Sequence, residues 1–94
     1  MKKSPRVDFS RQFIKQLRKL PLEIKMELRR RLILFSEEPL HPILRNHLLE
    51  VNFEGCHSIN ITGDWRAIYS EHEVETSEQV IVFEILGTHS QLYK

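Results

Sequence analysis

The sequence has little of several features on which common functions depend. Its 94 residues include a single cysteine, Cys56, so no internal disulfide can form. No apolar run approaches the ~20 residues that a membrane-spanning helix needs. The basic N-terminus lacks the apolar segment of a secretory signal. These absences predict a protein of the reducing cytoplasm. Cys56 is expected to pack in the protein interior and not to act as a nucleophile.

Motifs for metals and cofactors are also missing. The three glycines form neither a phosphate-binding loop nor a dinucleotide-binding pattern. His47, His57, Asp64 and His89 have side chains that can bind a metal, but no HExxH or CxxC spacing supports such a site. The sequence therefore predicts chemistry without a metal and without a cofactor.

What the chain does contain is a globular composition with an uneven distribution of charge. Hydrophobic residues at 40% and charged residues at 29% fit one folded domain over residues 1–94. Residues 1–35 hold eleven Lys and Arg against three acidic residues, whereas residues 36–94 hold three against ten. The net charge of +1 thus conceals a basic first third. This region is either a solvated helical face or a surface for a polyanion or an acidic partner.

The first third predicts a short strand, Arg6–Phe9, followed by two helices. Ser10 has the position of an N-cap, with Phe9 and Ile14 placed as a hydrophobic staple, and helical spacing of apolar residues predicts a helix over Arg11–Leu20. Pro21 suits the opening turn of a second helix over Leu22–Glu37. That helix carries two apolar lines on opposite sides: Ile24, Leu28, Leu32 and Phe35, and Leu22, Met26 and Ile33. We expect the lines to contact a sheet and the first helix, unless the second line binds a partner.

The rest of the chain predicts strands. Strands are expected at Ser58–Thr62, Trp65–Ser70 and Val80–Leu86, and His47–Phe53 is either a strand or an extended lead-in to them. An acidic loop is expected over Glu71–Gln79, Gly87 ends the last strand, and one helical turn follows over Ser90–Tyr93. The fold class is α+β. An N-terminal strand and a helical hairpin pack on one face of a mostly antiparallel sheet of four to five strands.

The turn between the two middle strands decides which side chains share a face. A two-residue loop would place Arg66 opposite Ile61, among apolar residues. A three-residue loop, Thr62–Gly63–Asp64, pairs Asn60 with Arg66 and keeps one face apolar. Glycine also suits the left-handed position that such loops need. The sequence therefore predicts the three-residue loop, with Asp64 at the rim.

This arrangement gathers polar side chains suited to RNA cleavage without a metal: His47, Asn60, Asp64, Arg66, His89 and Tyr93. Such cleavage needs a base for the 2′-OH, a cation for the phosphate and an acid for the leaving oxygen. His89 suits the acid role and His47 or Asp64 the base role. Arg66 offers a planar fork for phosphate oxygens, and Tyr93 can stack on a base. Alternatively, the histidines are structural, Arg66 pairs with Glu84, and Tyr93 anchors the tail.

Four segments carry a resemblance to a known family: FIKQLRKLP, LFSEEPLHP, NHLLEVNFEGCHSINITGDWRAIY and ILGTHSQLY. Together they make nearly the whole chain similar to the RelE/ParE superfamily of bacterial type II toxins, and most like its YafQ-like mRNA interferases. The combination of GDWR–IY with a terminal GTH–LY is the most specific part. The resemblance implies a RelE-like fold, ribosome-dependent cleavage of mRNA and neutralisation by a cognate antitoxin.

The resemblance also assigns roles to individual residues. His47, Asp64 and His89 match catalytic positions of the family, Arg66 matches an arginine that some branches use at the scissile phosphate, and Tyr93 matches the terminal aromatic residue. We place Asn60 and His57 with Tyr93 in substrate binding.

Four positions depart from the family pattern. Asn60 stands where the YafQ branch has a histidine, His57 replaces an arginine, Val51 a glycine and Glu54 a lysine. Since phosphate neutralisation supplies much of nucleic-acid affinity, we expect weaker RNA binding than in typical relatives.

The sequence as a whole therefore predicts a metal-independent endoribonuclease toxin with three partners: ribosome, mRNA and antitoxin. The alternative is a non-catalytic toxin of the same fold, either a gyrase inhibitor or a weakened toxin that only binds its antitoxin. The GTHSQLY end favours the enzyme, because a binding protein has no need for an acid beside an aromatic residue at that edge.

Overall fold

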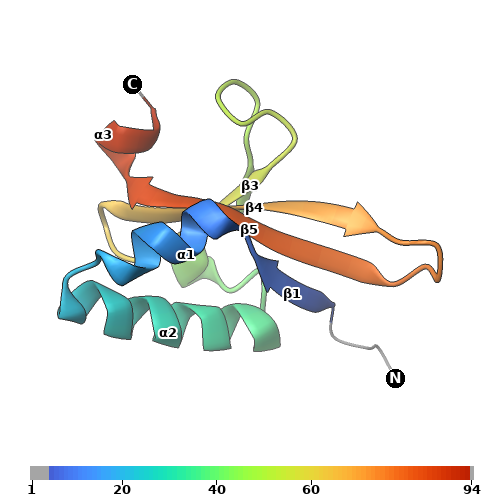
Figure 1. Ribbon diagram of the computed structural model, residues 1–94, viewed down its shortest axis with the longest axis horizontal. Coiled ribbons are helices and arrows are strands. Elements are labelled where there is room, and N and C mark those ends of the chain that lie inside the picture. Colours follow the sequence, from blue (N-terminus) through green and yellow to red (C-terminus); the bar gives the residue numbers. More distant parts are fainter. Residues whose placement is uncertain (1–4, 94) are drawn as a thin grey trace.

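Residues 5–93 are described by a computed structural model in which a five-stranded sheet separates two unequal layers (Figure 1). The elements follow the order β1 (Arg6–Phe9), α1 (Arg11–Arg18), α2 (Leu22–Glu37), a 3-10 turn (Pro42–Leu44), β2 (His47–Leu48), β3 (His57–Asn60), β4 (Trp65–Glu73), β5 (Gln79–Thr88) and α3 (His89–Leu92). The strand order in the sheet is β1-β5-β4-β3-β2, and only β1 runs parallel to its neighbour. The predicted α+β class and order of elements are confirmed.

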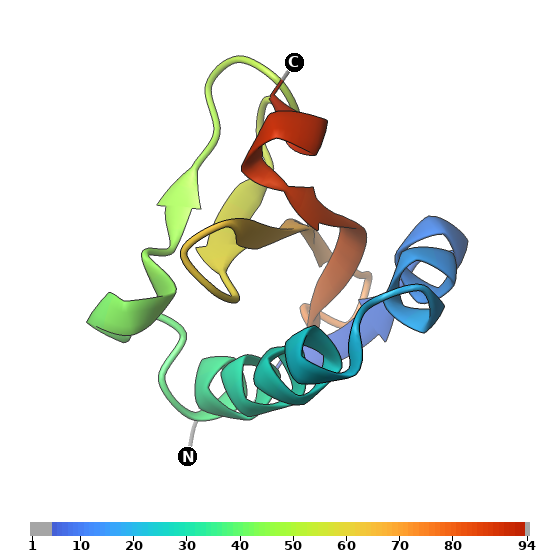
Figure 2. The ribbon, with the colours of Figure 1, turned by 90° about the vertical axis from the view of Figure 1, so that its left-hand side faces the viewer.

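One face of the sheet carries the main core, beneath α1 and α2 (Figure 2). Phe83 on β5 lies at its centre, with its ring centroid 5.5 to 5.8 Å from four other rings. Those rings belong to Phe9, Phe13, Phe35 and Tyr69. The alternation of β3 and β4 places Ile59 and Ala67 on this same face.

The opposite face of the sheet has a smaller core beneath α3 and the loop of residues 49–56. Leu49, Ile68 and Leu92 form it, with Cys56, Ile85 and Tyr93 packed around them. We call this the site face, because the polar residues Asn60 and Arg66 project from it.

The helices begin largely as the sequence predicts. The Ser10 hydroxyl accepts a hydrogen bond from the Phe13 amide at 3.0 Å, which confirms the N-cap. The Phe9 ring, predicted to staple onto Ile14, packs on Phe13 and Phe83. The helix α1 ends at Arg18, two residues before the predicted boundary.

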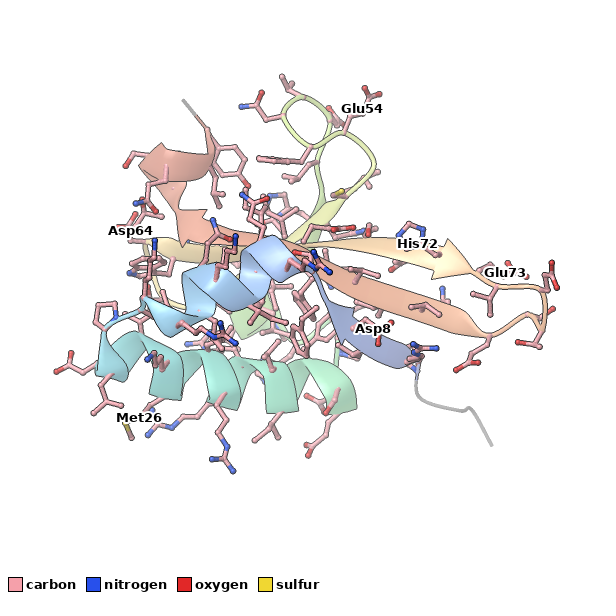
Figure 3. All side chains as sticks on the ribbon, viewed as in Figure 1. Asp8, Met26, Glu54, Asp64, His72 and Glu73 are labelled. Atoms are coloured by element: carbon pink, nitrogen blue, oxygen red, sulfur yellow. The ribbon has the colours of Figure 1, made fainter. Side chains whose placement is uncertain are left out.

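The second apolar line of α2 does not make the expected contact with α1, whereas binding of a partner by this line stays a prediction. Leu22, Met26 and Ile33 are 71%, 49% and 52% exposed, so they do not pack against α1. Figure 3 shows Met26 pointing away from both the sheet and α1. The reason is that α1 packs on β5, so both helices lie side by side on the sheet and α2 keeps one face in solvent.

The three-residue turn between β3 and β4 is confirmed. Asn60 pairs with Arg66, and the Ile61 amide donates to the Trp65 carbonyl at 2.9 Å. Gly63, however, has no left-handed backbone. The Thr62 hydroxyl oxygen holds the turn instead, because it accepts from the amides of Asp64 (3.2 Å) and Trp65 (3.0 Å).

Several strand boundaries differ from the prediction, including both ends of β3, which spans His57–Asn60 rather than Ser58–Thr62. The strand expected at His47–Phe53 shrinks to His47–Leu48, because the chain then turns through left-handed conformations at Phe53 and Gly55. The acidic loop is shorter than expected, because β4 and β5 continue into it as a projecting hairpin (Figure 1). Finally, β5 does not stop at Gly87 but runs on to Thr88.

Gly87 favours a close approach of α3 rather than ending the strand. A Cβ at this position would lie 3.1 Å from the Gln91 side-chain oxygen and 3.2 Å from a methyl carbon of Leu92. The missing side chain therefore lets α3 lie directly on β5.

Candidate active site

A polar hollow of about 420 Å³ opens on the site face between the 3-10 turn, β2, β3, β4 and α3. Its lining residues are Arg45, His47, Leu49, Asn60, Arg66, His89 and Tyr93. The set contains two arginines and two histidines but no carboxylate. The hollow is therefore suited to an anion.

His47 lies at one side of this polar hollow, on the two-residue strand β2. Its Nδ1 is 2.7 Å from the Arg45 carbonyl oxygen. A carbonyl can only accept, so this contact requires the proton on Nδ1. The neutral ring then has its lone pair on Nε2, where it can accept a proton.

Arg66 reaches the polar hollow from β4, beside Asn60 on β3. Its Nη1 donates to the carbonyls of Thr62 (3.1 Å) and Gly63 (2.9 Å), so the guanidinium also braces the turn. It forms no ion pair within residues 5–93. Glu84, the alternative partner, instead accepts from the Ser70 hydroxyl at 2.6 Å. The charge of Arg66 is therefore available to an anion.

His89 and Tyr93 approach from α3, at the C-terminal end of β5. Their ring centroids are 4.9 Å apart at an interplanar angle of 54°, as the expected helical turn implies. A capping box stabilises this short helix. The Gln91 backbone N–H donates to the Thr88 hydroxyl oxygen, and the Thr88 backbone N–H donates to the Gln91 side-chain oxygen. The His89 amide also donates to the Asp64 carbonyl at 2.9 Å, which ties α3 to the hairpin turn.

Two predicted site residues lie outside the polar hollow. Asp64 is exposed at the tip of the hairpin turn (Figure 3), and its backbone rather than its carboxylate contacts α3. His57 lies three residues from Asn60, so the alternation of β3 turns it toward the other face. There its ring stacks on Tyr69, with centroids 5.0 Å apart and planes 11° apart. Neither side chain lines the polar hollow, and the roles of Asp64 in catalysis and of His57 in substrate binding stay predictions.

One lining residue, Arg45, was missed by the sequence analysis. It has a left-handed backbone, with φ at 45° and ψ at 46°. The sequence could have pointed to Arg45, because Arg45 and Arg66 are the only Lys or Arg among residues 36–93. Both line the polar hollow.

Cys56 lies beneath the site face and is a poor nucleophile. Burial, followed by the charge of Glu84, raises the pKa of its thiol. Within the described part of the chain, no three His, Cys, Asp or Glu side chains gather as a metal site. No helix of residues 5–93 is long and apolar enough to cross a membrane.

A second hollow, the helix groove, lies between α1 and α2 on the far side of the sheet. Its volume is about 440 Å³, and its lining is Leu17, Lys25, Leu28, Arg29, Leu32, Ile33 and Ser36. Mostly apolar walls with two cations resemble the binding surface for an amphipathic acidic segment.

The chain is similar to proteins of a known family. A family model described as "Bacterial toxin of type II toxin-antitoxin system, YafQ" matches residues 5–94. No curated protein sequence matches the chain significantly.

Among solved structures, YafQ from E. coli strain BL21(DE3) is similar, with a TM-score of 0.70 and 23% identity over 96% of this chain and 99% of that one. The archaeal RelE–RelB complex from Pyrococcus horikoshii OT3 contains a chain that matches with a TM-score of 0.65 and 23% identity, covering 95% of this chain and 99% of the other. The E. coli DinJ–YafQ complex contains another, with a TM-score of 0.64 and 24% identity over 96% and 99% of the two chains. These likenesses confirm the RelE-like fold.

Proposed function

Because the chain belongs to the YafQ family of bacterial type II toxins, we propose that it is a metal-independent endoribonuclease that cleaves mRNA on the ribosome. The observation that carries the proposal is the polar hollow, which brings His47, Arg66, His89 and Tyr93 together without a carboxylate. This set supplies a base, a phosphate-binding cation, an acid and a stacking surface.

The reaction begins at the 2′-OH of the nucleotide before the scissile bond. Nε2 of neutral His47 takes the 2′-OH proton while the 2′-oxygen forms a bond to phosphorus. Protonated His89 gives its proton to the 5′-oxygen as the bond from phosphorus to that oxygen breaks. The products are a 2′,3′-cyclic phosphate and a 5′-OH. His47 takes the base role because Asp64 lies outside the polar hollow.

The remaining lining residues hold the substrate. The Arg66 guanidinium uses only Nη1 on the turn carbonyls, so its other nitrogens can donate to phosphate oxygens. The Tyr93 ring can stack on an unpaired base, and the Asn60 amide can hydrogen-bond a base or the ribose.

We further propose an antitoxin as the protein partner. Similar proteins have been solved as the DinJ–YafQ and RelE–RelB complexes. In this chain the helix groove and its cations, Lys25 and Arg29, offer a complementary surface for an acidic amphipathic helix.

The enzymatic proposal is tested by inducing the chain alone and mapping mRNA 5′ ends. The parent should arrest growth and create new ends in translated messages. His89→Ala should lower cleavage by at least about 10²-fold, since a positioned acid typically contributes ~10²–10⁴-fold. His72→Ala is the matched control, because His72 is exposed on the projecting hairpin, far from the polar hollow (Figure 3).

Two outcomes would contradict the proposal. Equal toxicity and cleavage by His89→Ala would remove the assigned acid. Intact mRNA together with inhibited supercoiling would instead establish a non-catalytic gyrase inhibitor.

A further inference from the structure

The backbone of Arg45 adopts a conformation that arginine rarely takes. Its φ of 45° is left-handed, and only Phe53 and Ser77 share a positive φ among the non-glycine residues of 5–93. For an L-residue this conformation is disfavoured, because it brings the Cβ too close to the following carbonyl oxygen. Such a residue persists only where its surroundings fix it.

Several contacts fix the chain on both sides of Arg45. The Arg45 amide donates to the Pro42 carbonyl at 3.1 Å, and the neighbouring Leu44 is fully buried. On the other side, the Asn46 side-chain amide donates to the Pro39 carbonyl at 3.0 Å and to the Tyr69 hydroxyl at 2.8 Å. The left-handed turn is therefore part of the tertiary structure.

The turn directs the Arg45 carbonyl back onto the His47 ring, 2.7 Å from Nδ1. In water, neutral imidazole side chains favour the other tautomer, with the proton on Nε2. A fixed carbonyl beside Nδ1 reverses that preference, because it can accept only from Nδ1–H. The reversal leaves the lone pair on Nε2.

We propose that Arg45 is a positioning residue whose left-handed backbone holds His47 as the Nδ1–H tautomer. The role of His47 Nε2 as the base rests on the proposed function, whereas the tautomer does not. The contact uses the backbone of Arg45, and its side chain is exposed at the polar hollow and forms no hydrogen bond within residues 5–93. Side chains at position 45 should therefore affect the tautomer of His47 only through their tolerance of a positive φ.

A matched pair of neutral substitutions separates the backbone from the charge. Asparagine tolerates the left-handed region, whereas a β-branched residue does not. Arg45→Asn should keep the contact with His47, and Arg45→Val should lose it. Arg45→Gly is a second tolerant variant, which should behave like Arg45→Asn.

The direct test is ¹⁵N NMR of the histidine rings in the whole chain at a pH where His47 is neutral. Ring nitrogens with and without a proton have well-separated shifts, and His47→Gln identifies the signal. The parent, Arg45→Asn and Arg45→Gly should show the proton on Nδ1. Arg45→Val should shift toward the Nε2–H tautomer. An Nε2–H tautomer in the parent would overturn the proposal without any variant.

Cleavage kinetics give the second readout. Arg45→Val should lower kcat at least about tenfold, a part of the ~10²–10⁴-fold that a positioned base contributes. Arg45→Asn should raise KM through the lost cation but leave kcat within about threefold of the parent. Equal kcat for the Asn and Val variants would contradict the positioning role. No cleavage by the parent would count against the proposed function, while the NMR result would still decide the tautomer.

Discussion

At the scale of single residues, the hydrogen bonds of a site residue decide what it remains free to do. The Arg66 guanidinium donates from Nη1 to the carbonyls of its own turn, and its other nitrogens remain free to donate to a ligand. The His47 ring donates from Nδ1 to a backbone carbonyl, and its Nε2 remains free to accept a proton. In both cases a backbone contact orients the side chain and leaves its reactive part unused.

Tyr69 supports His47 from the core. Its hydroxyl lies within hydrogen-bond distance of the Asn46 amide, which precedes His47 in the chain. Burial raises the pKa of Tyr69, and the charge of Glu71 adds to this, although the hydrogen bond from Asn46 lowers it. Because the folded pKa is raised, the stability that this residue contributes is complete below the unfolded value of about 10. It is lost as the pH rises through the folded pKa.

Tyr69→Phe should therefore cost stability at neutral pH and cost less at alkaline pH. The expected loss at pH 7 is about 0.5–1.5 kcal/mol, the net value of a typical hydrogen bond. Above a pH of about 10, the parent should lose stability more steeply than the variant, so the two curves converge. Urea unfolding between pH 7 and pH 11 measures this, and a constant gap would show that Tyr69 does not titrate as described.

At the scale of elements, α3 is too short to be stable alone. A helix of four residues cannot offset the cost of its nucleation. It forms because Thr88 and Gln91 make a capping box, Leu92 is buried, and Gly87 admits the helix onto β5. The position of His89 thus depends on contacts of its neighbours.

Removing the cap should loosen α3. Thr88→Val keeps the shape but removes the hydroxyl oxygen that accepts from the Gln91 amide. We expect a loss of about 1 kcal/mol of stability, typical for an N-cap, and a larger relative loss of cleavage because His89 is displaced. Thr88→Ser should restore both. Thermal unfolding and the mRNA cleavage assay measure the two effects, and full activity in Thr88→Val would show that the cap does not position His89.

At the scale of the whole molecule, the charges are divided between the two sides of the sheet. The cations of α1 and α2 lie opposite the polar hollow, whose only Lys or Arg residues are Arg45 and Arg66. On α2, Arg30 and Arg31 are already bonded to Glu27, and the hydrogen bond from Arg31 lowers the pKa of that carboxyl. Charge reversal at Arg30 or Arg31 would therefore change the stability of the fold as well as any binding affinity.

Lys25 and Arg29 offer a cleaner test, since both line the helix groove and neither forms an ion pair within residues 5–93. Reversing both to Glu should raise the Kd for the proposed antitoxin partner at least about tenfold, equal to ~1.4 kcal/mol. Reversal of Arg11 and Lys15 on α1, outside the groove, is the control. Calorimetry at low salt measures the affinity, and an unchanged Kd would mark Lys25 and Arg29 as ordinary solvated residues.

Much of the fold could be predicted because it depends on local patterns. The spacing of apolar residues gave the bounds of α2, and the alternation of β3 and β4 gave the pairing of Asn60 with Arg66. The same alternation, extended back to His57, puts that residue on the face of Ile59 and Ile61, so its predicted place beside Asn60 in substrate binding conflicted with the predicted register.

Other features could not be predicted, because they depend on how the elements pack. The second apolar line of α2 was expected to contact α1, but periodicity cannot tell which neighbour a helix will meet. The close approach of α3 to β5 at Gly87 likewise depends on how that helix packs.

The sequence by itself determined the class of fold, the β3–β4 register and the residue types available for chemistry, since these follow from periodicity and composition. Only the tertiary structure decided which of those residues share the polar hollow, because His47, Arg66 and His89 come from three different elements. It also decided the direction of the Arg45 carbonyl. That direction depends on a left-handed backbone that contacts from Pro39, Pro42 and Tyr69 hold in place.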